Sequence, residues 1–200
     1  VASSPVQFGQ VSRPGDIKYK DLNHDGVIDS NDQAPIGYNP VPEMTFSLAA
    51  GLNWKGIDFS ILLQGAARSS IYLQQDIAWD NFWGNYYEEH IGRWTPETAA
   101  TATYPRFTKA ATAAHPNYYK SDYWLKDSKY LRLKNIQLGY TIPRKLLKKF
   151  GVRSLRVYAN AYNLFTWDNV KKVDPESSNN SNGQFYPQQK VINFGINLNF

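Results

Sequence analysis

The sequence predicts an all-β fold, a segment of an antiparallel transmembrane β-barrel with long loops on one side. Five segments alternate apolar and polar residues over about nine to twelve positions, as strands with two unlike faces do. The connections between these segments are short and long by turns, which is typical of outer-membrane barrels. No apolar run approaches the roughly 20 residues of a membrane-spanning helix.

The first two strands are predicted to form a tight hairpin over residues 44–67. In "MTFSLAAGLNW" (44–54) every second residue is apolar, and after the break "KG" the alternation resumes in "IDFSILLQG" (57–65). We expect one face of the second strand to contact lipid and the other to face the barrel lumen. The expected lipid-facing residues are Ile57, Phe59, Ile61 and Leu63, and the expected lumenal residues are Asp58, Ser60 and Gln64.

Three more strands are predicted within residues 129–200. In "YLRLKNIQLGYTI" (130–142) the alternation changes phase at Lys134 and Asn135, as a β-bulge would cause. "LRVYANAYNLF" (155–165) alternates less regularly, whereas "VINFGINLNF" (191–200) alternates up to Phe200. Five strands cannot close in lipid, because open edges would leave backbone groups without hydrogen bonds. We therefore expect the remainder of a larger barrel to pair with them.

The long connections are predicted to lie outside the cell. They precede the first strand (1–43), join the second to the third (68–128) and join the fourth to the fifth. If the chain end at Phe200 lies on the periplasmic side, antiparallel topology places all three on the extracellular side.

Residues 21–32, "DLNHDGVIDSND", have the spacing of a calcium-binding loop. Oxygen-bearing residues recur at alternate positions, and Gly26 stands where EF-hand loops turn sharply. The Pro- and Gly-rich flanks exclude the helices of an EF-hand, so we expect a bound calcium ion to brace the loop rather than act as a switch. The alternative is a surface loop of Asx-turns without metal. The candidate ligands are Asp21, Asn23, Asp25, the Val27 carbonyl, Asp29 and Asp32.

The connection 68–128 is rich in aromatic residues, whose faces can stack on sugar rings or on a partner protein. The alternative is that these rings mainly pack the loop's own core. Glu88, Glu89 and His90 raise the possibility of a hydrolase, but adjacent side chains seldom converge on one centre, so we predict no catalytic residue. The candidate contacts to substrate or partner are Trp79, Trp83, Tyr86, Tyr87 and Trp94.

The composition excludes further classes of function. The net charge is +5, and the densest basic stretch is "PRKLLKKFGVR" (143–153). No reading helix or stacking module accompanies this stretch, so we interpret it as a solvated turn and not as a nucleic-acid site. The first residues have neither the basic start nor the apolar core of a signal peptide, and we expect a mature chain or the tail of a longer one.

From Pro14 to Phe200 the sequence resembles the C-terminal portion of SusC/RagA-type TonB-dependent transporters of Bacteroidetes. The resemblance rests on five blocks in order: "PGDIKYKDLNHDGVIDSNDQAPIG", "RWTPE" followed by "TYPR", "SDYWLKDSKYLRLKNIQLGYTIP", "LRVYANAYNLFT" and "FGINLNF". Within the fourth block, "NLFT" resembles the motif of the penultimate strand in TonB-dependent receptors.

The resemblance implies the last five strands of a barrel of about 22 strands with a plugged lumen. It also implies an outer-membrane importer of oligosaccharides or peptides, driven through TonB and capped by a SusD-like lipoprotein. The plug, the TonB-contact segment and most strands lie outside this sequence, so transport requires the remainder of the transporter. Phe200 would belong to the C-terminal assembly signal. The alternative is a soluble calcium-dependent carbohydrate-binding module, which would not need lipid-facing alternation.

Overall fold

The computed structural model describes residues 5–80, 82, 84–109, 114–170, 173–177 and 186–200. Within these ranges the chain forms two compact units whose segments alternate along the sequence. The loop unit comprises the described residues of 1–37 and 72–126, and the sheet unit comprises those of 38–71, 127–177 and 185–200. No helix in the described part of the chain is long and apolar enough to cross a membrane.

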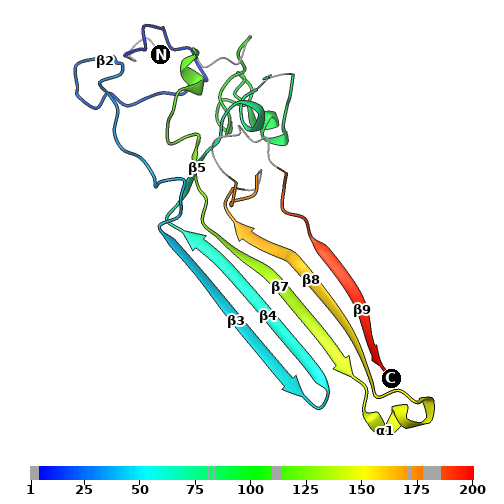
Figure 1. The fold of residues 1–200 in the computed structure, drawn as a ribbon. Coiled ribbons are helices and arrows are strands. Elements are labelled where there is room, and N and C mark those ends of the chain that lie inside the picture. The colour runs from blue at the N-terminus through cyan, green and yellow to red at the C-terminus, as the bar shows by residue number, and fades with distance from the viewer. Residues whose placement is uncertain (1–4, 81, 83, 110–113, 171–172, 178–185) are drawn as a thin grey trace. The chain divides into compact units, whose positions relative to one another are not determined.

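The sheet unit is a meander of five antiparallel strands. Consecutive long strands pair with each other, so the order across the sheet is the order in the sequence (Figure 1). The predicted antiparallel sheet is therefore confirmed, and so are the positions of its strands. They are β3 (Met44–Trp54), β4 (Ile57–Ala67), β7 (Tyr130–Thr141), β8 (Ser154–Asp168) and β9 (Val191–Asn199).

A β-bulge on β7 accounts for the change of phase in its sequence. Lys134 has no pairing partner on either neighbouring strand. Leu133 pairs with Leu63 and Ile136 pairs with Ile61, so two residues that are three positions apart point to the same side. The bulge predicted from the sequence is confirmed, and it keeps the apolar residues of β7 on one face.

The irregular alternation of β8 has a related cause. Tyr162 and Phe165 pair with β7 residues only two positions apart, so β8 contains one extra residue at this level. Asn163 takes up the irregularity with a φ of 50°, a left-handed conformation that asparagine tolerates better than most residues.

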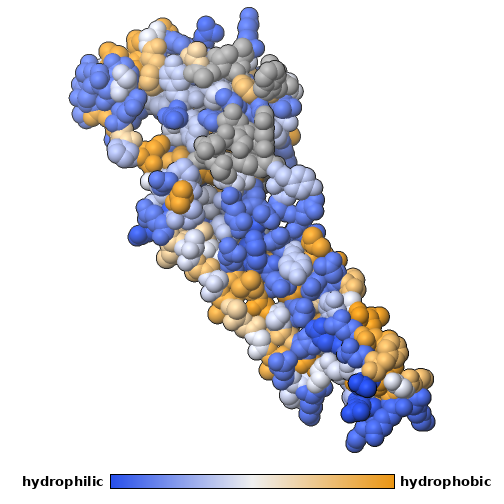
Figure 2. Space-filling view, in the orientation of Figure 1, coloured by the Kyte–Doolittle hydropathy of each residue, from blue (hydrophilic) through white to orange (hydrophobic). Residues whose placement is uncertain are grey.

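The sheet has one apolar and one polar face. Directly paired residues of antiparallel strands point to the same side. The predicted lipid-facing residues of β4 thus share a face with Leu52, Leu138 and Phe194, whose side chains are 62%, 55% and 83% exposed. Hydrophobic residues accordingly reach the surface of the sheet in Figure 2. The opposite face carries Asp58, Ser60 and Gln64 together with their paired residues Asn53, Ser47, Gln137, Arg132, Asn160, Thr166 and Asn193.

The two ends of the sheet differ in their connections. At one end β3 and β4 are joined by Lys55 and Gly56, whose φ values of 49° and 89° suit a two-residue hairpin. At the same end β7 and β8 are joined through helix α1 (Arg144–Leu147) and the 3-10 turn η4 (Lys148–Phe150). The longer connections, before β3 and after β4 and β8, leave from the opposite end.

The loop unit contains little regular structure. Strands β1 (Val6–Gln7) and β2 (Val27–Ile28) form a short parallel pair. Three 3-10 turns follow, namely η1 (Gln75–Ile77), η2 (Glu88–Gly92) and η3 (Pro116–Tyr118). The remaining short strands β5 (Ser70–Tyr72) and β6 (Leu125–Asp127) pair with each other, and each includes residues of both units.

Candidate functional site

The aromatic residues of the connection 68–128 divide into a packed core and an exposed group. Among the predicted contact residues, Trp79 is only 3% exposed and packs against Tyr118 at a ring distance of 4.9 Å. Tyr86 is 56% exposed and Tyr87 is also exposed, whereas Trp94 is half-buried beside Gly15. Trp83 lies outside the described residues. Tyr86 and Tyr87 therefore lie at the surface of the loop unit, whereas Trp79 packs in its interior.

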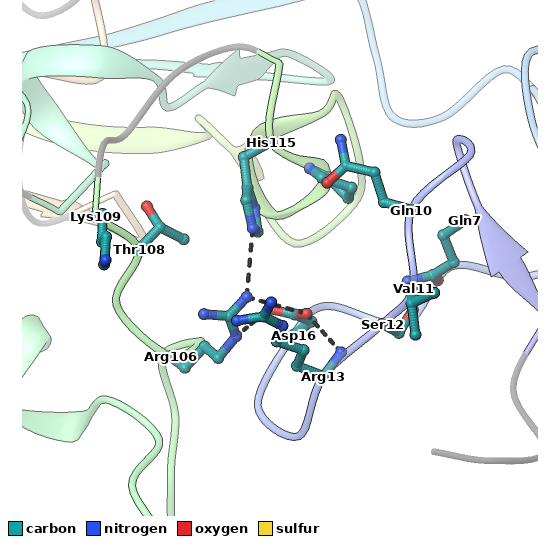
Figure 3. A pocket seen from close by; sticks show the side chains of 11 residues that line it. Gln7, Gln10, Val11, Ser12, Arg13, Asp16, Arg106, Thr108, Lys109 and His115 are labelled. Carbon is teal, nitrogen blue, oxygen red and sulfur yellow. Dashed lines mark hydrogen bonds and ion pairs between the residues drawn. The ribbon is translucent and has the colours of Figure 1, made fainter.

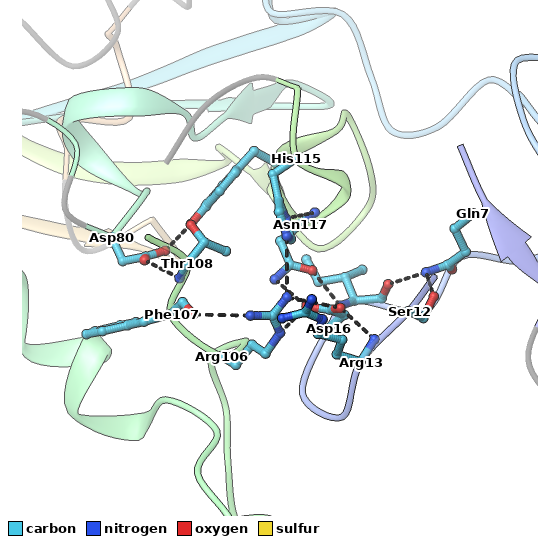
Figure 4. Close-up of polar contacts among 12 residues, drawn as sticks. Gln7, Ser12, Arg13, Asp16, Asp80, Arg106, Phe107, Thr108, His115 and Asn117 are labelled. Carbon is cyan, nitrogen blue, oxygen red and sulfur yellow. Dashed lines mark hydrogen bonds and ion pairs between the residues drawn. The ribbon is translucent and has the colours of Figure 1, made fainter. Parts of the chain in front are cut away.

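A buried carboxylate organises this interior. Asp80 is fully buried and accepts hydrogen bonds from the hydroxyl of Tyr118 and the N–H of Thr108 (Figure 4), and from the hydroxyl of Tyr104 at 3.4 Å. Burial, followed by the nearby Asp80, raises the pKa of both tyrosines, so their hydroxyls stay protonated as donors. Because the donors come from positions 104–118, Asp80 joins distant parts of the loop unit.

His90 has a structural role. Its Nδ1 accepts a hydrogen bond from the N–H of Tyr87 at 3.1 Å, so Nε2 carries the proton and donates to the Ala78 carbonyl at 3.2 Å. The ring is buried and packs on Tyr104 at 4.6 Å. Both ring nitrogens are thus engaged with backbone groups, and a Glu89 carboxylate oxygen lies 3.8 Å from Nε2.

A polar pocket of about 590 Å³ opens on the loop unit (Figure 3). The Arg106 guanidinium lies in it, with Nε 2.6 Å from a carboxylate oxygen of Asp16. Asp16 also accepts from the Arg13 N–H at 2.8 Å and from the Asn117 side chain at 3.1 Å. Burial lowers the pKa of His115, which lies beside Arg106. The other lining residues are Gln7, Gln10, Val11, Ser12, Thr108, Lys109 and Pro116.

This pocket can bind polar or acidic groups. Asp16 balances one of the cationic side chains, and Arg13 and Lys109 add further positive charge to the lining. The sequence did not predict the pocket, because its two sides come from residues 7–16 and 106–116. A local sequence pattern cannot predict contacts between residues that are about 100 positions apart in the chain.

The predicted calcium loop is ordered by its own carboxylates. Asp21 accepts a hydrogen bond from the Gly26 N–H at 2.9 Å, and Asp32 accepts from the N–H groups of Leu22 and Asp29 at 2.6 and 2.9 Å. The N–H of Asp29, and then that of Leu22, hold the pKa of Asp32 below its usual range. Asp32 is therefore ionised at neutral pH, as a cation ligand must be.

The loop offers oxygen atoms of the kind that a hard cation binds. In this structure its carboxylates do not surround one common point. Within the described ranges no three His, Cys, Asp or Glu side chains lie close enough together to hold a metal ion. Ionised carboxylates offer about four lone-pair positions each, so oxygens that accept N–H groups keep capacity for a cation. Ile28 on β2 is buried and pairs with Gln7 on β1. This pairing anchors the calcium loop to the loop unit.

The polar face of the sheet holds a buried arginine. Arg132 on β7 is 1% exposed and donates to both carboxylate oxygens of Asp174 at 2.8 Å and to the Thr166 hydroxyl at 3.0 Å. Glu176 lies 3.5 Å from the same guanidinium. These contacts fix the described start of the β8–β9 connection on the polar face.

The chain is similar in sequence to TonB-dependent receptors, although no protein-family profile matches it. It is 30% identical over 203 residues to TonB-dependent receptor P26 of Formosa agariphila, which covers 93% of this chain and 20% of that protein. It is 26% identical over 195 residues to TonB-dependent receptor SusC of Bacteroides thetaiotaomicron, which covers 96% of this chain and 18% of the relative. The chain thus spans about a fifth of the length of these curated relatives.

Two solved structures share the fold. The RagAB peptide importer in the open-open state superposes with a TM-score of 0.68 at 22% identity, covering 91% of this chain and 20% of that one. A structure of the RagAB peptide transporter gives a TM-score of 0.64 at 23% identity, with coverage of 85% and 20%.

Proposed function

Because this chain is homologous over more than nine-tenths of its length to part of the SusC-type TonB-dependent receptors, we propose that it forms five strands in the wall of an outer-membrane importer. The observation that carries the proposal is the exposed apolar face of the sheet, backed by a polar face. Moving a side chain such as Leu52 or Phe194 from water into an apolar environment lowers the free energy by about 1.5–3 kcal/mol. Lipid supplies that environment for a whole sheet face.

The edges of the sheet require neighbours from the same transporter. Within the described chain, β3 and β9 each pair on one side only. An unpaired edge in lipid leaves a row of backbone N–H and C=O groups without hydrogen bonds. The plug and the N-terminal strands of the transporter complete the barrel, and contact with TonB is made by that remainder.

The orientation follows from the lengths of the connections. Outer-membrane barrels have short periplasmic turns and longer extracellular loops. The Lys55–Gly56 hairpin and the α1 turn then face the periplasm, and the longer connections leave the sheet on the outside, where substrate arrives. A SusD-like lipoprotein caps this side. We assign contact with an oligosaccharide or peptide substrate, or with the lipoprotein, to four features of the loop unit. They are exposed Tyr86 and Tyr87, half-buried Trp94 and the Arg106 pocket.

A calcium ion bound by residues 21–32 would stabilise the loop unit. Its expected ligands are Asp21, Asn23, Asp25, the Val27 carbonyl, and Asp29 or Asp32. The support is the ligand spacing, the ionised state of Asp32 and the anchoring by buried Ile28. The ion would offset the mutual repulsion of carboxylates crowded into 12 positions.

The membrane assignment is tested by single spin labels on β4. Labels at Phe59 and Ser60, which point to opposite faces of one strand, should differ in collision with a lipid-soluble quencher in the assembled protein. The label at Phe59 should be the more accessible to the quencher. Equal accessibility at the two sites would overturn the assignment of faces.

The assembly is tested by purification from native membrane. A tag on this segment should bring down the plug-and-barrel remainder and a surface lipoprotein. The competing function, a soluble calcium-dependent sugar-binding module, predicts a compact monomer that needs no detergent and binds sugar only with calcium.

A further inference from the structure

The turn between β7 and β8 combines exposed cations with exposed apolar side chains. Leu147 is buried, α1 contacts β8, and Gly151 follows η4 with a φ of 68°. On the outside of this turn lie the exposed basic residues Arg144, Lys145, Lys148, Lys149 and Arg153.

The turn itself holds no acidic counterpart to these cations. Residues 142–157 include no aspartate or glutamate, and the adjacent hairpin residue Lys55 adds another positive charge. Among the described residues, no ion pair includes any of the five basic residues of the turn. Asp58, which also lies at this end, is paired with Arg156 on the polar face. The short-connection end of the sheet is therefore strongly cationic.

Apolar side chains stand among these cations. Leu146 and Phe150 are 66% and 75% exposed, which costs free energy in water and fits an interfacial location. Trp54 and Tyr140 both pair with Ile57, one from each neighbouring strand, in the last row of the apolar face, and both are exposed. Tryptophan and tyrosine form girdles at the level of lipid headgroups in membrane barrels. Figure 2 shows hydrophilic and hydrophobic side chains side by side at the α1 end of the sheet.

We propose that the β7–β8 turn is a membrane-surface anchor that binds the headgroups of anionic phospholipids in the periplasmic leaflet. The proposal rests on the proposed function, because it needs the apolar sheet face to lie in lipid. Leu146 and Phe150 enter the interface just beyond the Trp54–Tyr140 row. The ammonium groups of Lys145, Lys148 and Lys149 then contact the lipid phosphates. Because the turn contains no acidic residue, none of its side chains repels these phosphates.

The test places a fluorophore on the turn of the assembled transporter in mixed bilayers. This chain has no cysteine, so Leu146→Cys provides one labelling site within it. Quenching is compared when either the phosphatidylglycerol or the phosphatidylcholine of the same bilayer is brominated. We expect phosphatidylglycerol to be enriched about fivefold around the label, the effect of roughly one cation near an anionic surface. Raising the salt to about 1 M should remove most of the enrichment.

Matched variants separate the turn from net charge. Lys145→Gln, Lys148→Gln and Lys149→Gln together should bring the enrichment close to onefold. Lys18→Gln, Lys20→Gln and Lys120→Gln remove the same charge from exposed positions of the loop unit and should leave it unchanged. Equal quenching by the two lipids, or equal loss in both triple variants, would overturn the anchor. A label at Phe59 that no brominated lipid quenches would instead overturn the proposed membrane location.

Discussion

Asp58 and Arg156 form an ion pair across the strand that separates them. The Arg156 Nε donates to Asp58 Oδ1 at 2.9 Å, and the pair passes over Gly139 on β7. A Cβ at Gly139 would lie 2.5 Å from both the Arg156 guanidinium and the Asp58 carboxylate. The glycine therefore provides the space in which β4 is linked to β8.

Replacing Gly139 by alanine should displace this ion pair. We expect Gly139→Ala to lower the unfolding temperature of the assembled protein modestly, because a partly exposed ion pair contributes little to stability. Thermal unfolding in detergent micelles measures the loss. Gly51→Ala on β3 is the matched control, because its Cβ would meet only the Phe59 carbonyl at an ordinary 3.5 Å. In an Asp58→Asn background the Gly139→Ala effect should shrink, and equal losses from the two alanine variants would contradict this explanation.

Calcium binding should depend on the loop carboxylates. Asp21→Asn with Asp25→Asn removes two charged ligands and should weaken calcium affinity at least tenfold, measured by calorimetry after chelation. Asn31→Ala alters a neighbouring side chain outside the predicted ligand set and should leave the affinity near its original value. If the unaltered protein takes up no calcium at millimolar concentration, the loop is the metal-free Asx-turn alternative.

Acidification should loosen the loop unit around His115. Burial lowers the pKa of His115, so the folded state favours the neutral ring. The stability from this group is present above its unfolded pKa of about 6.5 and is lost as pH falls through the folded value. Protonation of Nδ1 also removes the acceptor of the Asn117 N–H, which donates to it at 3.1 Å.

Hydrogen exchange at Asn117 reads out this change. Its protection factor, corrected for the intrinsic pH dependence of exchange, should fall between about pH 7 and pH 5. His115→Gln should flatten that dependence, whereas His24→Gln, an exposed change in the calcium loop, should not. An unchanged protection factor over this range would show that protonation of His115 does not affect the stability of the η3 turn.

The sheet could be predicted because its signal is local. A strand with one face toward lipid must alternate with a period of two, and this alternation is visible within ten residues. Even the bulge at Lys134 appears in the sequence, because it reverses the phase between Leu133 and Ile136. The faces of β4 followed from the same alternation.

The loop unit could be predicted only in part, because its contacts join distant residues. Asp80 receives donors from Tyr104 and Tyr118, and the Arg106 pocket is closed by Asp16. The aromatic composition indicated a role in contact or packing, but nothing local separates buried Trp79 from exposed Tyr86. Ring packing in an irregular loop depends on chain crossings, which no period of the sequence encodes.

Phe200 should govern assembly more than substrate binding. The apolar alternation of β9 runs on to Phe200, which is largely exposed beyond the end of the strand. If this residue belongs to the signal read by the outer-membrane assembly machinery, its deletion from the full-length gene should reduce the assembled fraction several-fold while assembled protein keeps its substrate affinity. Phe194→Ala is the matched control, because it removes an equally large exposed ring from within β9 and keeps Phe200. Folded and unfolded protein are quantified by their mobility in SDS before and after heating. Equal losses from both changes would mean that assembly responds to the lipid-facing area of β9 and not to a terminal signal.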